Sequence, residues 1–206
     1  MGRRLATTVV LLATALFSGC ATTGLQSGQT VYLGDLGGAP IARDQPHKRE
    51  TSLPDTTSYW DGDGVTGSPS ITIDLGEQRA LFYKGGELVG VSAISTGREG
   101  YNTPAGNFKL TQKDIDHRSN LYGDYVDSEG NVVMGDIGVN THKAPPGTHF
   151  LGAPMFYFMR VHGAVGMHAG FLPGYAASHG CIRMPSKMAK TFYDNAPSGT
   201  PIRVTY

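Results

Sequence analysis

The chain has 206 residues, of which 39% are hydrophobic, and it carries 29 glycines, 12 prolines and no formal net charge. This length suits one domain with a terminal extension, and the glycine and proline content is typical of a loop-rich protein rather than one of long helices. Because positive and negative charges balance, the composition does not favour nucleic-acid binding, and we expect no nucleic-acid partner.

The N-terminus has the anatomy of an export signal. Two arginines precede a short apolar stretch, which ends in two small residues directly before Cys20. The stretch is too short for a comfortable membrane span and is typical of a secretory signal. A cysteine in this place resembles the bacterial lipobox, in which Cys20 would be lipid-modified and become the new N-terminus. We expect a lipoprotein signal peptide at residues 1–19; the alternative is an ordinary signal peptide cleaved near Ala21.

This start predicts an exported, periplasm-facing protein that acyl chains anchor to a membrane of the cell envelope. The outer membrane is favoured, because Ala21 replaces the Asp that often signals retention in the inner membrane. Residues 20–69 show no sustained apolar periodicity and are predicted to form a tether, which could include short packed pieces. The run Asp61–Gly64 within them is interpreted as a turn, since the rest of a calcium-binding loop is missing.

From residue 70 onward the alternation of apolar and polar residues predicts a mostly β domain, 70–206, with one or two short helices. Gly85-Gly86 and Asp127–Gly130 are the expected hairpin turns. A helix is expected after the second cysteine, with Ser186 as its N-cap and an apolar stripe that includes Phe192. The expected strands lie at residues 71–75, 79–84, 87–95, 108–110, 122–126, 131–134, 155–161 and 202–206.

The chemistry is concentrated around Cys181, the one cysteine outside the export signal. A free thiol with a pKa of about 8.5 is only a few per cent ionised at pH 7 and needs an imidazole to activate it. His168 and His179 flank a loop that would bring an imidazole to the sulfur. Gly180 permits a sharp bend, and the amides of Gly180 and Cys181 are candidate donors to an oxyanion, to which His179 could add a side-chain donor.

Other interpretations of these residues stay open at the level of sequence. Cys181 could be a buried structural thiol, because free cysteines are often buried. His168, His179 and Cys181 could ligate zinc, but the chain lacks the usual Cys-x-x-Cys and His-x-x-x-His spacings, so we expect no metal. His162, which is also followed by glycine, is an alternative base. No cofactor-binding motif is present, and no cofactor is expected.

The run Ser178–Met184 (SHGCIRM) after a His-x-Gly element, with Ser95–Gly97 and Thr103–Phe108 upstream, resembles the L,D-transpeptidase catalytic domain, the YkuD-like family of cell-wall enzymes. The similarity covers residues 70–206 and implies a β-sandwich with a short helix near the cysteine. Members of the family attack the peptide bond after the third residue of a peptidoglycan stem tetrapeptide. They release the terminal D-Ala and pass the acyl group through a thioester to an amine.

By this resemblance Cys181 would be the nucleophile, and His168 would be the base, oriented by a backbone carbonyl near Ala169. His179 and Gly180 would help to form the oxyanion site.

The same resemblance implies substrate-side roles for Ser178 and Arg183. Arg160 could support a carboxylate-rich substrate, although a solvated arginine at a strand end is the more ordinary interpretation. The polar run Asp116–Asn120 could line the cleft or form a surface loop.

The expected partners are therefore peptidoglycan stem peptides, a wall-attached protein as a possible acceptor, and a membrane reached through the N-terminal lipid. With water as acceptor, the same nucleophile would make an L,D-carboxypeptidase or an amidase. A non-catalytic peptidoglycan-binding lipoprotein is a further alternative. The sequence does not separate them, because the shape of the cleft and its access to water select the acceptor.

Overall fold

The computed structural model of the protein describes residues 52–206. The expected signal peptide at residues 1–19, Cys20 and the first part of the expected tether lie outside the described residues. Within the described part, no helix is both long and apolar enough to cross a membrane.

The described chain consists mainly of β-strands with one helix, as the alternation of apolar residues predicted. The elements in chain order are β1 (Tyr59–Trp60), β2 (Pro69–Asp74), β3 (Arg79–Lys84), β4 (Glu87–Ala93), β5 (Gly106–Lys109), β6 (Gln112–Asp114), β7 (Arg118–Val126), β8 (Val132–Gly138), β9 (His149–Pro154), β10 (Phe158–His162), β11 (Val165–Ala169), β12 (Ile182–Met184), α1 (Ser186–Asn195) and β13 (Pro201–Thr205).

Six strands form the largest sheet, in the order β1-β4-β3-β2-β13-β5. The predicted hairpin between β3 and β4 is confirmed, and its turn glycines Gly85 and Gly86 have φ of 60° and 88°, which glycine adopts without steric cost. β13 runs parallel to β2, with Ile202 opposite Ile71. The last strand of the chain therefore lies inside this sheet, between β2 and β5, rather than at its edge.

A second sheet has the order β12-β11-β10-β6, and β11 and β12 are its parallel pair. Both sheets and α1 contribute to one hydrophobic core. Its members include Phe82 from the larger sheet, Met159 and Met167 from the second sheet, and Phe192 from α1, all of them buried. The rings of Phe82 and Phe192 meet edge to face with centroids 5.0 Å apart, a favourable geometry for aromatic pairs. The core thus fixes β11 and β12 against the rest of the domain.

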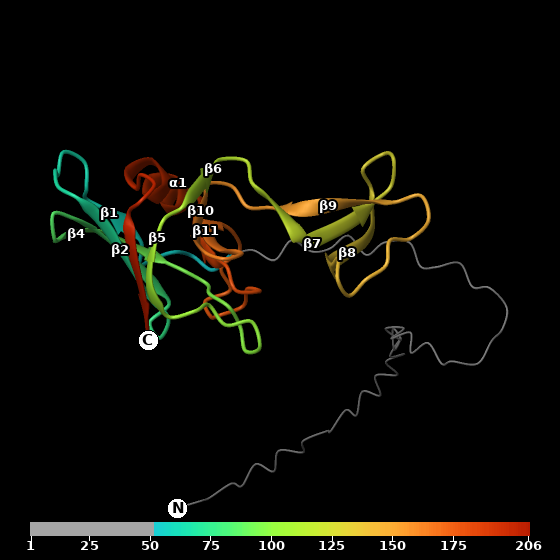
Figure 1. The fold of residues 1–206 in the computed structure, drawn as a ribbon, viewed down its shortest axis with the longest axis horizontal. Coiled ribbons are helices and arrows are strands. Elements are labelled where there is room, and N and C mark those ends of the chain that lie inside the picture. Colours follow the sequence, from blue (N-terminus) through green and yellow to red (C-terminus); the bar gives the residue numbers. More distant parts are fainter. Residues whose placement is uncertain (1–51) are drawn as a thin grey trace, which may run out of the picture. The chain divides into compact units, whose positions relative to one another are not determined.

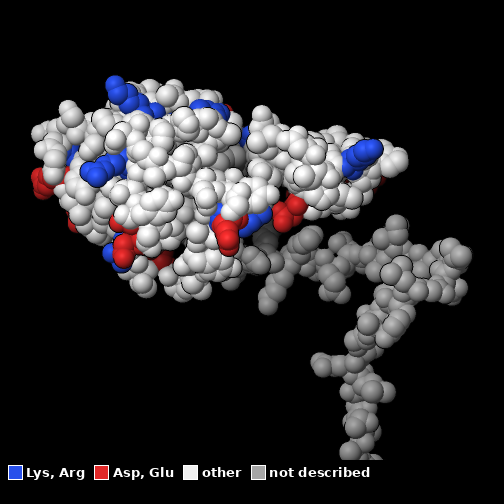
Figure 2. All heavy atoms as spheres, turned by 60° about the horizontal axis from the view of Figure 1, so that its bottom comes forward, with Lys and Arg blue, Asp and Glu red and all other residues white. Residues whose placement is uncertain are grey.

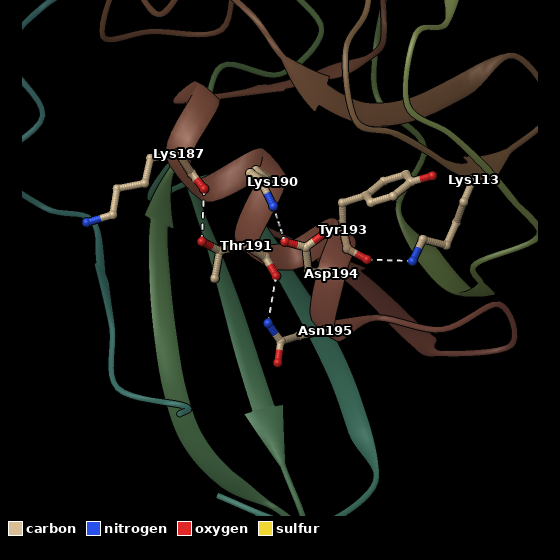
Figure 3. A network of polar contacts seen from close by, with 7 residues as sticks. All are labelled: Lys113, Lys187, Lys190, Thr191, Tyr193, Asp194 and Asn195. Carbon is tan, nitrogen blue, oxygen red and sulfur yellow. Dashed lines mark hydrogen bonds and ion pairs between the residues drawn. The ribbon is translucent and has the colours of Figure 1, made fainter. Parts of the chain in front are cut away.

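Polar contacts also hold α1 in place (Figure 3). The ammonium group of Lys113 on β6 donates a hydrogen bond to the backbone carbonyl of Tyr193 near the end of the helix. Within the helix, the Thr191 hydroxyl donates to the carbonyl of Lys187, 2.9 Å away. The bond from Lys113 connects α1, which follows β12 directly, to the opposite edge of the second sheet.

The arm sheet, which consists of β7, β8 and β9 in the order β8-β7-β9, is the third sheet of the described residues. Figure 1 draws it beside the other sheets. Tyr125, Val126 and Ile137 are buried in it, but none of them belongs to the main core cluster. The consecutive side chains of Val132 and Val133 on β8 are 51% and 52% exposed. The arm sheet therefore has few buried apolar side chains of its own.

Short packed pieces occur in the expected tether, since β1 pairs with β4 and the Trp60 ring lies 5.2 Å from that of Phe82. Two sequence-based expectations differ from the structure. The central strand begins at Phe158 rather than at residue 155, since Tyr157 has a φ of 58° and interrupts the extended backbone. Ser186 is the first helical residue, and Pro185 holds the N-cap position without a side-chain cap.

Candidate active site

The parallel pairing of β11 and β12 arranges the predicted site residues on one side of the second sheet. His168 lies opposite Arg183 in the register. Successive side chains alternate between the two faces of a strand, and the neighbours Met167 and Ile182 are fully buried in the core. His168 and Arg183 therefore face away from the core. Cys181 directly precedes β12, two positions before Arg183, and shares that side.

A cavity of about 660 Å³ lies on this side of the sheet, and Cys181 lines it. His168 lines the same cavity, whereas the alternative base His162 is absent from its lining. The ring of His162 packs instead against Phe108, with centroids 4.9 Å apart. The predicted site residues that the structure brings to this cavity are Cys181, His168, His179, Ser178 and Arg183.

One hydrogen bond sets the orientation of the His168 imidazole. Its Nδ1 lies 2.8 Å from the carbonyl oxygen of Ala169. A carbonyl oxygen only accepts, so Nδ1 carries the proton and Nε2 has a free lone pair. The carbonyl near Ala169 that the family resemblance implied is therefore in place.

Burial keeps both the imidazole and the thiol uncharged. It lowers the pKa of His168 to about 4, and the hydrogen bond to Ala169 offsets only part of this effect. Burial also raises the pKa of the Cys181 thiol, against the opposing effects of the Gly166 backbone and of nearby guanidinium charges. Near pH 7 the site holds a neutral thiol and a neutral imidazole, and the thiol lies within hydrogen-bond distance of the carbonyl of Ala164, at 3.7 Å.

The backbone around the cysteine forms a turn that Ser178 closes. The Ser178 hydroxyl donates to the carbonyl oxygen of Cys181 at 2.5 Å and accepts the Gly180 N–H at 3.0 Å. Gly180 has a φ of 111°, where side chains other than that of glycine are strained. The Gly180 amide is thus engaged inside the turn, and the Ser178 hydroxyl is used to shape it.

Thr103 is a site residue that sequence reasoning did not single out. Its buried hydroxyl donates to the carbonyl oxygen of Gly180 at 2.8 Å and accepts the N–H of Gly97 at 3.0 Å. A Cβ added at Gly97 would lie only 1.9 Å from the carbonyl oxygen of Tyr101, so this approach requires glycine. The sequence signal for Thr103 is its place at the start of Thr103–Phe108, a segment that contributes to the family resemblance alone.

His179 connects the turn to the arm sheet. Its ring stacks on Tyr122 of β7, with centroids 4.1 Å apart and planes 20° from parallel. Arg98 donates to its Nε2 from 2.8 Å, so the remaining ring proton lies on Nδ1. Burial, followed by the charge of Arg98, lowers the pKa of His179 and favours the neutral ring.

Basic side chains reach the cavity from strands remote from the cysteine. Arg118 on β7 and Arg160 on β10 line it together with Arg183, and no Asp or Glu belongs to its lining. The polar run around Arg118 thus lines the cleft, which was one of its two interpretations. Figure 2 shows basic and acidic side chains interspersed over the face in view. Within residues 52–206 no cluster of side chains suits a metal ion.

Comparisons with known proteins identify a family and similar folds. A family model described as the L,D-transpeptidase catalytic domain (YkuD) matches residues 68–204. The fold resembles an L,D-transpeptidase from Mycobacterium smegmatis, with a TM-score of 0.50 and 22% identity over 68% of this chain and 59% of that one. An L,D-transpeptidase from Xylanimonas cellulosilytica has the same TM-score, 0.50, and 22% identity over 68% of this chain and 61% of that one.

A third similar structure is that of the Ldtfm–avibactam carbamoyl enzyme, with a TM-score of 0.50 and 25% identity over 68% of this chain and 49% of that one. The chain therefore spans about half to three fifths of the length of these solved structures. No curated protein matches the chain.

Proposed function

Because the chain belongs to the L,D-transpeptidase catalytic-domain (YkuD) family, we propose that it is a cysteine acyltransferase of the cell wall. Its donor is a peptidoglycan stem tetrapeptide, and Cys181 attacks the peptide bond after the third residue. One observation carries this proposal: Cys181 and the correctly oriented imidazole of His168 line the same cavity.

The first half-reaction begins with transfer of the thiol proton to Nε2 of His168. The sulfur of Cys181 attacks the scissile carbonyl carbon as this proton leaves, because a thiol with a raised pKa is not already ionised. The imidazolium then returns the proton to the departing amine of the terminal D-Ala. The product is a thioester between the sulfur and the third residue of the stem.

The developing oxyanion needs hydrogen-bond donors close to the sulfur. The Gly180 amide already donates to Ser178, so we assign this role to the amide of Cys181 itself. His179 has its free proton on Nδ1 and is the candidate side-chain donor, since its Nε2 accepts from Arg98. Gly180 contributes by the backbone conformation that it permits.

In the second half-reaction an amine attacks the thioester carbon while His168 accepts its proton. The carbon–sulfur bond then breaks, and the imidazolium returns the proton to the sulfur of Cys181. An amine of a neighbouring stem would give a cross-link, and an amine of a protein would give its attachment to the wall. Because one acyl bond replaces another, the reaction needs no nucleotide outside the membrane. We propose that it takes place in the periplasm, with the protein lipid-anchored through Cys20.

Product analysis with defined tetrapeptides tests this function. Wild-type protein should release D-Ala and, with an added amine, form a new amide that mass spectrometry detects. Cys181→Ala should lose at least about 10³-fold in rate, as expected when a catalytic nucleophile is removed. An unchanged rate in Cys181→Ala would exclude the proposed nucleophile, and hydrolysis alone in the presence of amine would identify water as the acceptor.

Acylating agents provide an independent test of the thiol. LdtMt1 was solved in complex with imipenem, and Ldtfm was solved as a carbamoyl enzyme with avibactam. We expect imipenem to label this protein once, at Cys181, and to leave Cys181→Ala unlabelled. The matched control is Cys20→Ala, which retains Cys181 and should label like the wild type. An inert Cys181 would favour a non-catalytic peptidoglycan-binding protein.

A further inference from the structure

The cavity around Cys181 concentrates positive charge that no carboxylate in its lining balances. Arg118, Arg160 and Arg183 all line it, although the whole chain has no formal net charge. The two ion pairs found within residues 52–206 involve none of these arginines. Asp136, which acts on Arg183 from a distance, lines a neighbouring cavity. A partly enclosed site of this kind attracts anions.

Arg160 is held in position before any substrate binds. Its Nε donates to the side-chain oxygen of Gln112 at 2.8 Å, and its Nη1 donates to the carbonyl of Gly163 at 2.8 Å. The guanidinium also lies over the ring of Phe158, 4.9 Å from the centroid. Its Nη2 takes part in neither bond, so a positioned donor remains for a ligand.

Arg118 belongs to a different part of the cavity. Arg183 follows Cys181 by two positions. Arg160 donates to the carbonyl of Gly163, next to Ala164, whose carbonyl accepts the Cys181 thiol at 3.7 Å, so both arginines lie near the sulfur. Arg118 comes instead from the first position of β7 in the arm sheet. Its Nη1 donates to the carbonyl of Gly152 on β9 at 2.9 Å, which leaves Nε and Nη2 for a ligand.

We infer that Arg118 binds a carboxylate on the acyl side of the donor, so that the enzyme selects stems in which this group is a free acid over stems in which it is a carboxamide. This subsite rests on the proposed acyl transfer. The terminal residue of a tetrapeptide carries a carboxylate next to the scissile bond, which suits Arg160 and Arg183 near the sulfur. Arg118 then remains for a second carboxylate. A guanidinium binds a carboxylate through two charge-assisted hydrogen bonds, whereas a carboxamide offers one acceptor and no charge.

The test compares two tetrapeptides that differ only in their acyl-side carboxylates, which are free in one and carboxamides in the other. Calorimetric titration of Cys181→Ala, which cannot turn them over, should show about tenfold or greater preference for the free acid. The preference should disappear in the double variant Cys181→Ala/Arg118→Gln. Equal affinities in Cys181→Ala, or an undiminished preference in the double variant, would overturn the Arg118 subsite.

Two further variants serve as a control and as a charge-preserving comparison in this test. Arg203→Gln, on an exposed position of β13, is the matched control and should retain the full preference. Arg118→Lys preserves the charge but not the planar fork, so the preference should fall to an intermediate value. Loss of the bond to Gly152 could prevent Arg118→Gln from folding, and the test then depends on Arg118→Lys. If Arg118→Lys prefers the free-acid tetrapeptide as strongly as Cys181→Ala does, the Arg118 subsite is overturned.

Release of D-Ala by the protein with Cys181 intact tests the proposed acyl transfer separately from the Arg118 subsite. Release from both tetrapeptides with equal kcat/KM would support acyl transfer and overturn the selection by Arg118. A preference in binding without any release would support the subsite and overturn the proposed reaction.

Discussion

The turn that carries Cys181 and the arm sheet differ in how the rest of the protein holds them. Ser178 in the turn exchanges backbone hydrogen bonds with Thr96 and Arg98 at 2.9 and 3.0 Å, and Thr103 supports Gly180 from the other side. The arm sheet, in contrast, exposes apolar side chains such as Val133 and touches the turn through a stacked pair of rings.

This difference matches two tasks of the proposed acyltransferase. A nucleophile and its base act well only when their geometry is set before the substrate arrives, which dense hydrogen bonding and core packing provide. The arm sheet contributes Tyr122 and Arg118 to the same cavity. Because that sheet is less buried, we expect changes in it to alter substrate binding more than the stability of the domain.

The largest expected effect concerns His168 in the buried part of the site. Its pKa in the folded protein, about 4, lies below the ordinary value of 6.5, so the unfolded chain binds more protons between these values. The stabilising contribution is present above pH 6.5 and is lost as the pH falls toward 4. Wild-type protein should lose roughly 3 kcal/mol of unfolding free energy from this group between pH 7 and pH 4. Urea unfolding at each pH should show a shallower dependence in His168→Gln, and identical dependences would contradict the prediction.

A pair of threonines compares the two regions directly. Thr103→Val leaves the carbonyl of Gly180 and the N–H of Gly97 without their partner in a buried place, so we expect a loss of about 2 kcal/mol or more. Thr148→Val removes a bond to the carbonyl of Pro145 in a partly exposed loop before β9, and about 0.5–1 kcal/mol should be lost. Denaturant unfolding measures both, and equal losses would remove the distinction between turn and arm sheet.

The stack of Tyr122 on His179 tests how the two regions communicate. Tyr122→Ala should weaken the contact between the arm sheet and the Cys181 turn. The loss of ring stacking should cost about 0.5–1.5 kcal/mol in addition to the energy of the lost buried area, as for other ring pairs. We expect KM for the tetrapeptide to rise severalfold while kcat changes little, because the bond from Arg98 still positions His179 and the Cys181 turn keeps its own hydrogen bonds. Tyr206→Ala, at a position 80% exposed, is the control and should leave both constants unchanged. A fall in kcat alone would instead place Tyr122 in the chemical step.

The smallest effect is expected on the outer surface of the arm sheet. Val133 is 52% exposed on β8. Val133→Thr keeps the branched shape that suits a strand, so the unfolding free energy should change by no more than about 0.5 kcal/mol. A loss above 1 kcal/mol in thermal or urea unfolding would show that the arm sheet depends on this side chain more than its exposure indicates.

The sequence by itself determined the class of the fold and the centre of the site. Hydrophobic periodicity depends only on neighbours in the chain. Together with the Gly85-Gly86 turn, it was sufficient to predict strand β2, the β3–β4 hairpin and α1. Cys181, His168 and His179 stand close together in one motif, so their shared cavity followed from a local pattern. The short strands β6 and β12, of three residues each, are too brief to show such alternation.

Only the tertiary structure decided which distant residues surround the cysteine. Arg118 and Arg160 approach the site through the pairing of strands remote in sequence, and that pairing leaves no periodic signature in any one segment. Thr103 reaches the site from the loop before β5 through its bonds to Gly97 and Gly180. The same holds for β13, which lies between β2 and β5 because Ile202 and Val204 fill the core there. Buried contacts of this kind depend on all the packed elements together, so the charge and shape of the substrate cavity are properties of the folded chain.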